Sequence, residues 1–320
     1  MTRQTLERHQ VWIYLAAILA GLGFGSLVPG AAEGLELALW PSLGLLLYAT
    51  FTQVPLARLP AAFRDRRFMA AILFGNFLIV PLFVWGLMAF VPADPAIRLG
   101  VLLVLLVPCT DWYITFTHLA GGDTERAIAV TPVNLLVQIG LLPVYLFLFM
   151  GNSFLEILSV DRVLVAFGLL ILLPMFAAWA TERWAGKSVS RAGVVARIGG
   201  LPVPLLALVV FLIAASQVTA VSAAMEAVRD VTLVFAAFLI GAAVIGLGLG
   251  RLMRLTPASV SALIFSLGTR NSFVVLPLAL ALGAGWETAS VVIVFQSLVE
   301  LFGMVVYLWA VPRLVGFRGG

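Results

Sequence analysis

The residues best suited to chemistry lie inside an apolar stretch at residues 105–116, which reads LLVPCTDWYITF. The only cysteine of the chain, Cys109, stands here between Pro108 and Thr110, and Asp111 follows them. A thiolate is a soft ligand for thiophilic species. One thiolate alone binds such species weakly enough to release them, as a transporter requires. Cysteine is also among the most buried residue types, so a packing role is the alternative.

Three ionisable side chains other than Cys109 are expected deep in the membrane, away from the ends of the predicted spans: Asp111, Arg270 and Glu300. A charge at the centre of a bilayer costs about 3 kcal/mol, so each of the three is a candidate functional residue. We expect Asp111 and Arg270 to form an ion pair, which either clamps the fold or takes part in substrate binding. Glu300 follows Gln296 by one helical turn and is a candidate for proton exchange. A hydrogen bond to a neighbouring span is the alternative role for Glu300.

The composition indicates that these residues belong to a polytopic membrane protein. The chain is 62% hydrophobic and 11% charged, with a mean hydropathy of +1.13, whereas average domains carry about 25% charged residues. Its pI near 9.7 is no argument for nucleic acid, because basic residues in short loops set membrane topology. One cysteine excludes an intramolecular disulfide and a zinc site built on several thiolates. We expect neither a metal nor a cofactor.

Apolar runs separated by charged or Pro/Gly-rich segments predict ten transmembrane helices. The first run is too long for a signal peptide, and no loop is long enough to hold a second domain. Residues 1–320 are therefore expected to form one all-α transmembrane domain. The predicted spans lie near 11–28, 34–54, 68–91, 96–119, 127–149, 160–180, 198–220, 229–250, 257–281 and 287–310.

The distribution of basic residues between these spans predicts the orientation of the chain. Most lysines and arginines fall on one side, and only Arg98, Arg162 and Arg229 fall on the other. The positive-inside rule then places both termini in the cytoplasm. The protein is expected in the plasma membrane, that is, the inner membrane of a bacterium.

The two halves of the chain resemble each other weakly, which predicts an internal repeat of residues 1–150 and 151–320. Residues 108–149 align with 267–309. Five spans per half is an odd number, so the halves would have opposite orientations, as in many transporters. The alignment places Cys109 and Thr110 on Gly268 and Thr269, and Asn134 and Gln138 on Gln296 and Glu300.

The repeat also predicts where spans four and nine are broken. Pro108 removes a backbone donor and clashes with the preceding turn, and Gly268 relaxes the backbone at the matched position. We expect two broken helices that cross beside a protected cavity, because lipid-facing backbone does not tolerate such breaks; a plain kink is the alternative. The expected substrate-binding residues are Cys109, Thr110, Thr269, Arg270 and Asn271, supported by the polar side chains of Asn134, Gln138 and Gln296.

With VPCTDWYITFTHLAGGD in span four and SLGTRNSFVVLPLALAL in span nine, the chain resembles the bile acid:sodium symporter superfamily over nearly its whole length. Within it, the chain is most similar to the arsenite efflux permeases. Those permeases carry Pro-Cys-Thr in span four, here Pro108, Cys109 and Thr110, and the resemblance implies that the cysteine is required for arsenite transport. They also carry Leu-Val-Glu in span ten, which implies a functional role for Glu300.

The chain departs from that superfamily at the sodium ligands. The glutamate of the sodium symporters falls on Ser266 and their glutamine on Arg270, while their Ser-Asn pair in span four falls on Tyr113 and Ile114. A carboxylate ligand is lost, and a fixed cation stands where a bound cation would lie. Sodium coupling is therefore expected to be abolished. Arg270 also departs from the arsenite efflux permeases, which makes the chain a divergent relative.

These observations favour a secondary transporter that extrudes arsenite or antimonite, with protons as the expected counter-ion and no sodium requirement; uniport stays open. The alternative is a small organic anion, such as a carboxylate, bound by Arg270 and the positive ends of half-helices. An enzyme is not expected, since the sequence has no metal-ligand cluster, Ser/His pairing or nucleotide loop. The expected partners are a small-molecule substrate and membrane lipid. The oligomeric state is left open.

Overall fold

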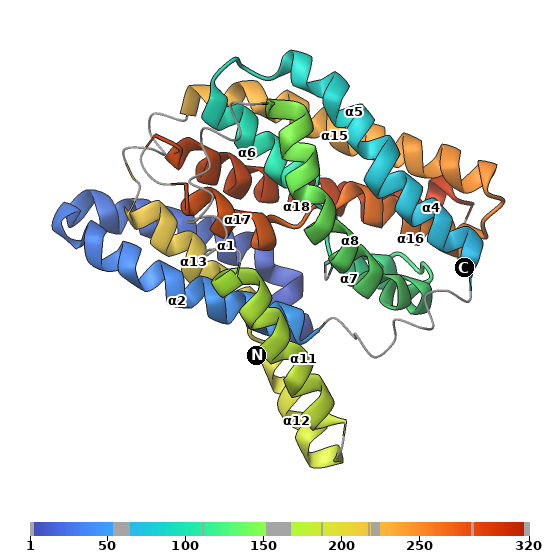
Figure 1. Ribbon diagram of the computed structural model, residues 1–320, viewed down its shortest axis with the longest axis horizontal. Coiled ribbons are helices and arrows are strands. Elements are labelled where there is room, and N and C mark those ends of the chain that lie inside the picture. Colours follow the sequence, from blue (N-terminus) through green and yellow to red (C-terminus); the bar gives the residue numbers. More distant parts are fainter. Residues whose placement is uncertain are drawn as a thin grey trace.

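The computed structural model describes residues 3–53, 65–110, 112–151, 168–186, 188–216, 218, 225–282 and 285–316. Within these ranges every regular element is a helix, and a single β-bridge joins Pro108 and Arg270. The all-α prediction is therefore confirmed for the part of the chain that the structure describes. Figure 1 shows the arrangement of the helices, which pack at several different inclinations.

The structure describes eighteen helical elements, including short 3-10 and π-helical turns. In order they are α1 (Arg3–Leu27), η1 (Pro29–Ala31), α2 (Ala32–Phe51), α4 (Arg66–Phe74), η3 (Gly75–Ile79), α5 (Val80–Leu87), η4 (Met88–Phe90), α6 (Pro95–Leu105), α7 (Trp112–Leu119), α8 (Thr124–Met150), η5 (Gly168–Leu172), α11 (Leu173–Ala185), α12 (Val189–Ile198), α13 (Pro202–Ser216), α15 (Met225–Leu252), α16 (Pro257–Gly268), α17 (Ser272–Leu280) and α18 (Glu287–Leu314).

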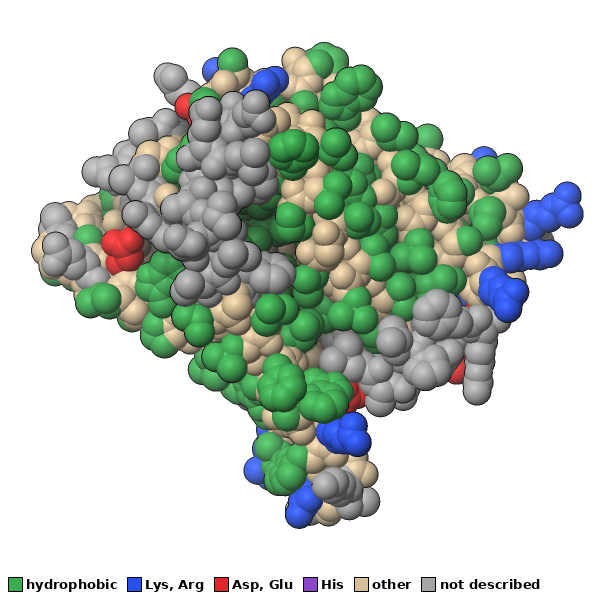
Figure 2. Space-filling model, viewed as in Figure 1, with side chains coloured by type: hydrophobic (Ala, Val, Ile, Leu, Met, Phe, Trp, Pro, Cys, Tyr) green, Lys and Arg blue, Asp and Glu red, His purple; other side chains and the backbone are tan. Residues whose placement is uncertain are grey.

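The helices are apolar outside as well as inside. Six helical segments of the described chain are long and apolar enough to cross a bilayer. Large apolar side chains such as Leu82, Trp85 and Leu233 are largely exposed, and Figure 2 shows hydrophobic side chains over much of one face, with Lys and Arg side chains toward its edges. Apolar side chains on this scale are stable against lipid rather than water. The chain is a multi-pass membrane protein.

Where the predicted spans fall on described residues, they coincide with helices. Spans four and nine each consist of two shorter helices, α6 with α7 and α16 with α17. Shorter apolar helices accompany the six long ones at Trp12–Leu27, Pro95–Leu105 and Pro257–Gly268. The count of ten spans and the inverted relation of the halves stay predictions. The predicted span at 160–180 lies partly outside the described residues.

The helices pack in two groups. In the first group, α13 packs on α1 and α2, and α11 packs on α2; Figure 1 shows α1, α2 and α13 side by side at one end of the molecule. In the second group, α15 packs on α16 and α18, α18 packs on α6, and α7 packs on α8 and α16. The groups meet where α2 contacts α17 and α1 contacts α18.

Capping residues fix where the helices of the second group begin. The carboxylates of Asp94 and Asp123 accept hydrogen bonds from the N–H groups of Ile97 and Arg126, and so cap α6 and α8. Thr256 caps α16 in the same way, with a proline following it at the first helical position. These side chains satisfy backbone donors that a helix start leaves free. The starts of these helices are therefore encoded locally.

Candidate functional site at two helix breaks

Two helices are interrupted where they pass each other. α6 ends at Leu105 and α7 begins at Trp112, while α16 ends at Gly268 and α17 begins at Ser272. The connecting segments run antiparallel: the N–H of Cys109 donates to the carbonyl of Thr269 at 3.1 Å, and the N–H of Asn271 donates to the carbonyl of Val107 at 2.8 Å. Each break therefore supplies backbone partners that the other break has lost.

The side chain of Asn271 ties the two breaks together a second time. Its Oδ1 accepts from the N–H of Val274 at 3.3 Å and caps α17, while its Nδ2 donates to the hydroxyl of Thr110 at 3.1 Å. The hydroxyl of Thr269 donates to the carbonyl of Phe265. The two threonines and the asparagine are buried. The polar groups expected at the substrate site are brought together, and they bond to one another in this structure.

Gly268 is required by packing as well as by the break. A Cβ atom at this position would lie 2.6 Å from Cε2 of Tyr307, on α18. Contacts under 3.0 Å are essentially never seen for real Cβ atoms. The aromatic ring thus packs directly on the end of α16, a contact that sequence spacing does not reveal.

Arg270 lies in the centre of the crossing and is 2% exposed. Its Nη2 donates to Oδ1 of Asn76 at 3.0 Å and to the carbonyls of Ser266 and Leu267 at 3.0 and 2.6 Å. Its Nη1 donates to the carbonyl of Leu105 at 3.3 Å. The guanidinium therefore binds two carbonyls in the last turn of α16, the last carbonyl of α6 and one amide oxygen.

The backbone of the same residue connects the crossing to α18. The N–H of Arg270 donates to Oε2 of Glu300 at 2.9 Å, and Nε2 of Gln296 donates to the same oxygen at 2.8 Å. Oε1 of Gln296 accepts from the hydroxyl of Ser272 at 3.4 Å. The guanidinium also lies over the ring of Phe238, 5.2 Å from its centroid. Gln296 and Glu300, two of the predicted site residues, thus lie at the second break.

Asn76 is a residue of this site that the sequence reasoning missed. It lies in η3, a π-helical turn between α4 and α5, and is fully buried. Its Nδ2 donates to the hydroxyl of Ser266 at 3.0 Å, while its Oδ1 accepts from Arg270. Single π-helical turns within α-helices are often found at functional sites. A lone amide in an otherwise apolar span was the available signal in the sequence.

Asn134 and Gln138 differ in hydrogen bonding from Gln296 and Glu300, the residues of α18 with which the predicted repeat aligns them. Both lie on α8, one turn apart, and both are buried. Neither side chain has a hydrogen-bond partner among the residues that the structure describes. A buried amide without hydrogen-bond partners lowers the stability of the folded state by about 1–3 kcal/mol per polar atom. This pair therefore retains hydrogen-bonding capacity that Gln296 and Glu300 have already used.

Two further predicted residues complete the account of the site. Cys109 is 2% exposed and lies within the crossing, and it takes part in no disulfide. Asp111 lies outside the described residues, so its ion pair with Arg270 stays a prediction. Tyr113 and Ile114 follow in α7, and the hydroxyl of Tyr113 bonds to the carbonyl of Ala127 and to the hydroxyl of Thr131, at 2.5 and 2.7 Å.

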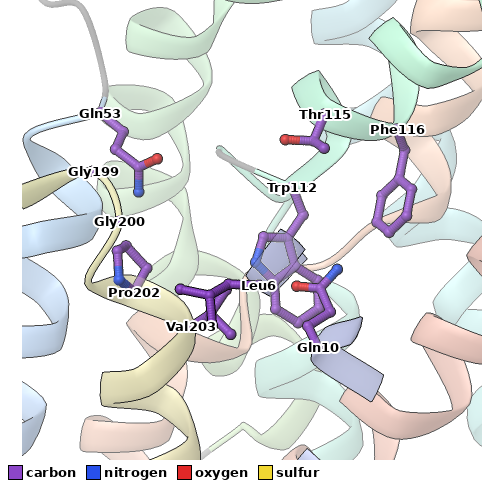
Figure 3. Close-up of a pocket in the computed structure, with 10 residues that line it drawn as sticks. All are labelled: Leu6, Gln10, Gln53, Trp112, Thr115, Phe116, Gly199, Gly200, Pro202 and Val203. Carbon is purple, nitrogen blue, oxygen red and sulfur yellow. The ribbon is translucent and has the colours of Figure 1, made fainter. Parts of the chain in front are cut away.

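A small cavity opens beside the start of α7, between the two helix groups (Figure 3). Trp112 stacks on Tyr14 of α1, with their ring centroids 6.1 Å apart, and Oε1 of Gln10 is buried without a partner in the described chain. None of the described residues that line it is charged. They are Leu6, Gln10, Gln53, Trp112, Thr115, Phe116, Gly199, Gly200, Pro202 and Val203.

An all-helical membrane domain with two interrupted helices that cross inside it is the architecture of a secondary transporter. A comparison with known families supports this class. Residues 40–246, more than half of the chain, match the sodium bile acid symporter family, and the chain belongs to that family. A comparison with curated proteins finds no match. Family members are transporters and not enzymes, which implies a small-molecule substrate and a lipid environment.

Proposed function

We propose that the protein extrudes arsenite or antimonite from the cytoplasm across the plasma membrane, in exchange for protons and without sodium. The observation that carries this proposal is the position of Cys109. Its thiol lies in a crossing of two helix breaks, buried from water and flanked by backbone that belongs to neither helix. A soft sulfur ligand at the point where transporters of this architecture bind their substrates suits trivalent arsenic.

The cavity beside α7, whose described lining residues are all uncharged, supports a neutral substrate. Gln10, Gln53 and Thr115 offer hydrogen bonds, and Trp112 offers an aromatic face. Trp112 is three residues from Cys109 along the chain. Arsenite as As(OH)₃ would pass from this cavity to the thiol. It would then leave on the other side when the group of α1, α2, α11 and α13 moves against the second group.

The positions of the family's sodium ligands support independence from sodium. A sodium ion needs several oxygen ligands in an open space. Here the guanidinium of Arg270 already binds the carbonyl oxygens at the end of α16. The Tyr113 side chain, at the place of a family ligand in span four, bonds to Thr131 and Ala127. The residues of this chain do not fit the ion that gives the family its name.

Proton exchange is proposed for Glu300 or Asp111. Glu300 is 1% exposed, and one of its oxygens accepts both an amide N–H and the Gln296 side chain. A buried carboxylate at the crossing is in a position to couple its protonation to movement of the broken helices. The inverted repeats and the cytoplasmic termini predicted above belong to the same proposal.

The organic-anion alternative has less support. An anion-binding arginine must direct N–H groups at its ligand. Both terminal nitrogens of Arg270 instead bind protein oxygens, and the side chain is 2% exposed. Only Nε of Arg270 has no partner in the described chain, so a carboxylate that bound the terminal nitrogens would have to displace these bonds. We therefore favour the neutral metalloid substrate.

Transport into everted vesicles tests this proposal. Vesicles that contain the full-length protein should take up arsenite when a proton gradient is present, and vesicles without it should not. Replacing sodium by potassium or choline should leave uptake unchanged. Uptake of a carboxylate with no uptake of arsenite would overturn the proposed substrate, and strict dependence on sodium would overturn the proposed coupling.

A further inference from the structure

We propose that the guanidinium of Arg270 is a built-in cation, which permanently fills an alkali-cation site at the crossing. Removing its side chain should therefore open that site to a cation from solution. The proposal rests on the geometry around Arg270 and does not depend on which substrate is carried.

The oxygen atoms around the guanidinium are of the kinds that bind alkali cations. Among the residues that the structure describes, its acceptors are neutral oxygens: the carbonyls of Leu105, Ser266 and Leu267 and the amide oxygen of Asn76, at 2.6–3.3 Å. Carbonyls at the ends of interrupted helices and side-chain amide oxygens are the ligands that transporters use for sodium. Hard cations prefer all-oxygen ligand sets.

The charge balance at the site points the same way. The carbonyl ends of α6 and α16 both point at this space, and the C-terminus of a helix carries partial negative charge. Glu300 adds negative charge, since its carboxylate accepts a hydrogen bond from the backbone N–H of Arg270. Without a cation, these groups would face one another in a buried space. The guanidinium supplies the missing positive charge and is further stabilised by the ring of Phe238.

The built-in cation also has a mechanical consequence. Through one side chain, the end of α6, the end of α16 and the π-helical turn η3 are joined. A dissociable ion would assemble this junction only when bound. A covalently attached cation keeps it assembled throughout the transport cycle, so the crossing needs no ion to hold its geometry.

The test is the thermal stability of purified full-length protein in detergent. Unfolding is followed with a thiol-reactive fluorescent dye, because Cys109 is the only cysteine and is 2% exposed. Arg270→Ala should unfold on the order of 10 °C below wild type. Low millimolar sodium or methylguanidinium, but not choline, should restore half or more of that loss. Wild type should respond to none of these cations.

Two further variants keep the test decisive. Arg270→Lys retains the charge and should fold without responding to added cations, whether or not Arg270→Ala folds. Arg251→Gln, at an exposed position in the last turn of α15, should behave as wild type. A sodium response in wild type or in Arg270→Lys would overturn the proposal. So would an Arg270→Ala protein that no cation stabilises, or one that fails to fold even when expressed with sodium.

Discussion

The N–H of Arg270 donates a 2.9 Å hydrogen bond to Oε2 of Glu300. This bond fastens the long helix α18 to the break between α16 and α17. A backbone donor freed by the break is thereby satisfied by a carboxylate buried at the same depth. The bond places the residue proposed for proton exchange directly at the break between α16 and α17.

Glu300→Gln should separate the structural role of this side chain from its role in coupling. A glutamine oxygen still accepts from the N–H of Arg270, so thermal stability should fall by only about 1 kcal/mol. Arsenite uptake into everted vesicles should no longer respond to a proton gradient. Glu287→Gln, at the start of α18, is the control and should retain the response. If uptake by the Glu300→Gln protein still responds fully to the proton gradient, a residue other than Glu300 couples transport to protons.

Cys109→Ser should remove arsenite transport and preserve folding. Serine keeps the size and hydrogen-bonding ability of the side chain but lacks the soft sulfur, and losing about 1.4 kcal/mol of ligand binding lowers the rate tenfold. Uptake should fall by about tenfold or more, with membrane expression near wild type. Arsenite should also slow alkylation of the wild-type thiol. Full arsenite resistance from the serine variant would reduce Cys109 to a packing residue.

Asp111 and Arg270 should show coupled effects when both are changed. If they form an ion pair, each single neutralisation leaves a buried charge unpaired, at a cost of about 3–5 kcal/mol. Asp111→Asn and Arg270→Gln should each impair stability and transport. The double variant should recover part of the loss in a double-mutant cycle. Losses that simply add would mean that the two charges act independently.

The amides of Asn134 and Gln138 on α8, which have no hydrogen-bond partner among the described residues, predict opposite effects on stability and on transport when they are removed. Asn134→Leu and Gln138→Met replace buried polar groups by apolar ones of similar shape, so stability should stay level or rise by about 1 kcal/mol. Arsenite uptake should fall if these amides bind substrate or its water. Thr50→Val is a matched control, since the hydroxyl of Thr50 is buried and unpartnered on α2 within the described chain. Lower stability in the α8 variants would instead indicate a structural role.

The contact between Asp65 and Arg126 predicts a dependence of stability on pH. Partial burial raises the pKa of Asp65. The N–H of Phe68 and the guanidinium of Arg126, 2.7 Å away, more than offset this, so the pKa lies below its ordinary value of 3.8. The native state thus favours the ionised form. The resulting stabilisation is present above pH 3.8 and is lost as pH falls through the lowered value.

Asp65→Asn measures this contribution, because asparagine still caps α4. Both partners are partly exposed, so the variant should lose only about 0.5 kcal/mol at pH 7. The difference from wild type should shrink below pH 3.8 and at high salt. Glu125→Gln, at an exposed position in the first turn of α8, should show no such pattern. A difference that persists in acid would contradict the ion-pair origin.

The sequence by itself determined the class of the protein and the places where its helices are interrupted. Apolar runs indicate membrane helices whatever their partners are, because length and composition alone decide transfer into lipid. Pro108 disrupts its own helix through local geometry. The few charges at membrane depth, including Arg270 and Glu300, were recognisable for a similar reason, since their cost depends on depth and not on contacts.

Only the tertiary structure decided what those residues bind. The carbonyl that accepts from Nη1 of Arg270 belongs to Leu105, 165 residues earlier, and Asn76 comes from a third helix. Backbone carbonyls have no sequence identity, so no residue pattern marks them as partners. The contact of Gly268 with Tyr307 likewise depends on how α16 and α18 approach. Spacing along one helix fixes which side chains share a face, and only packing between helices fixes which atoms meet.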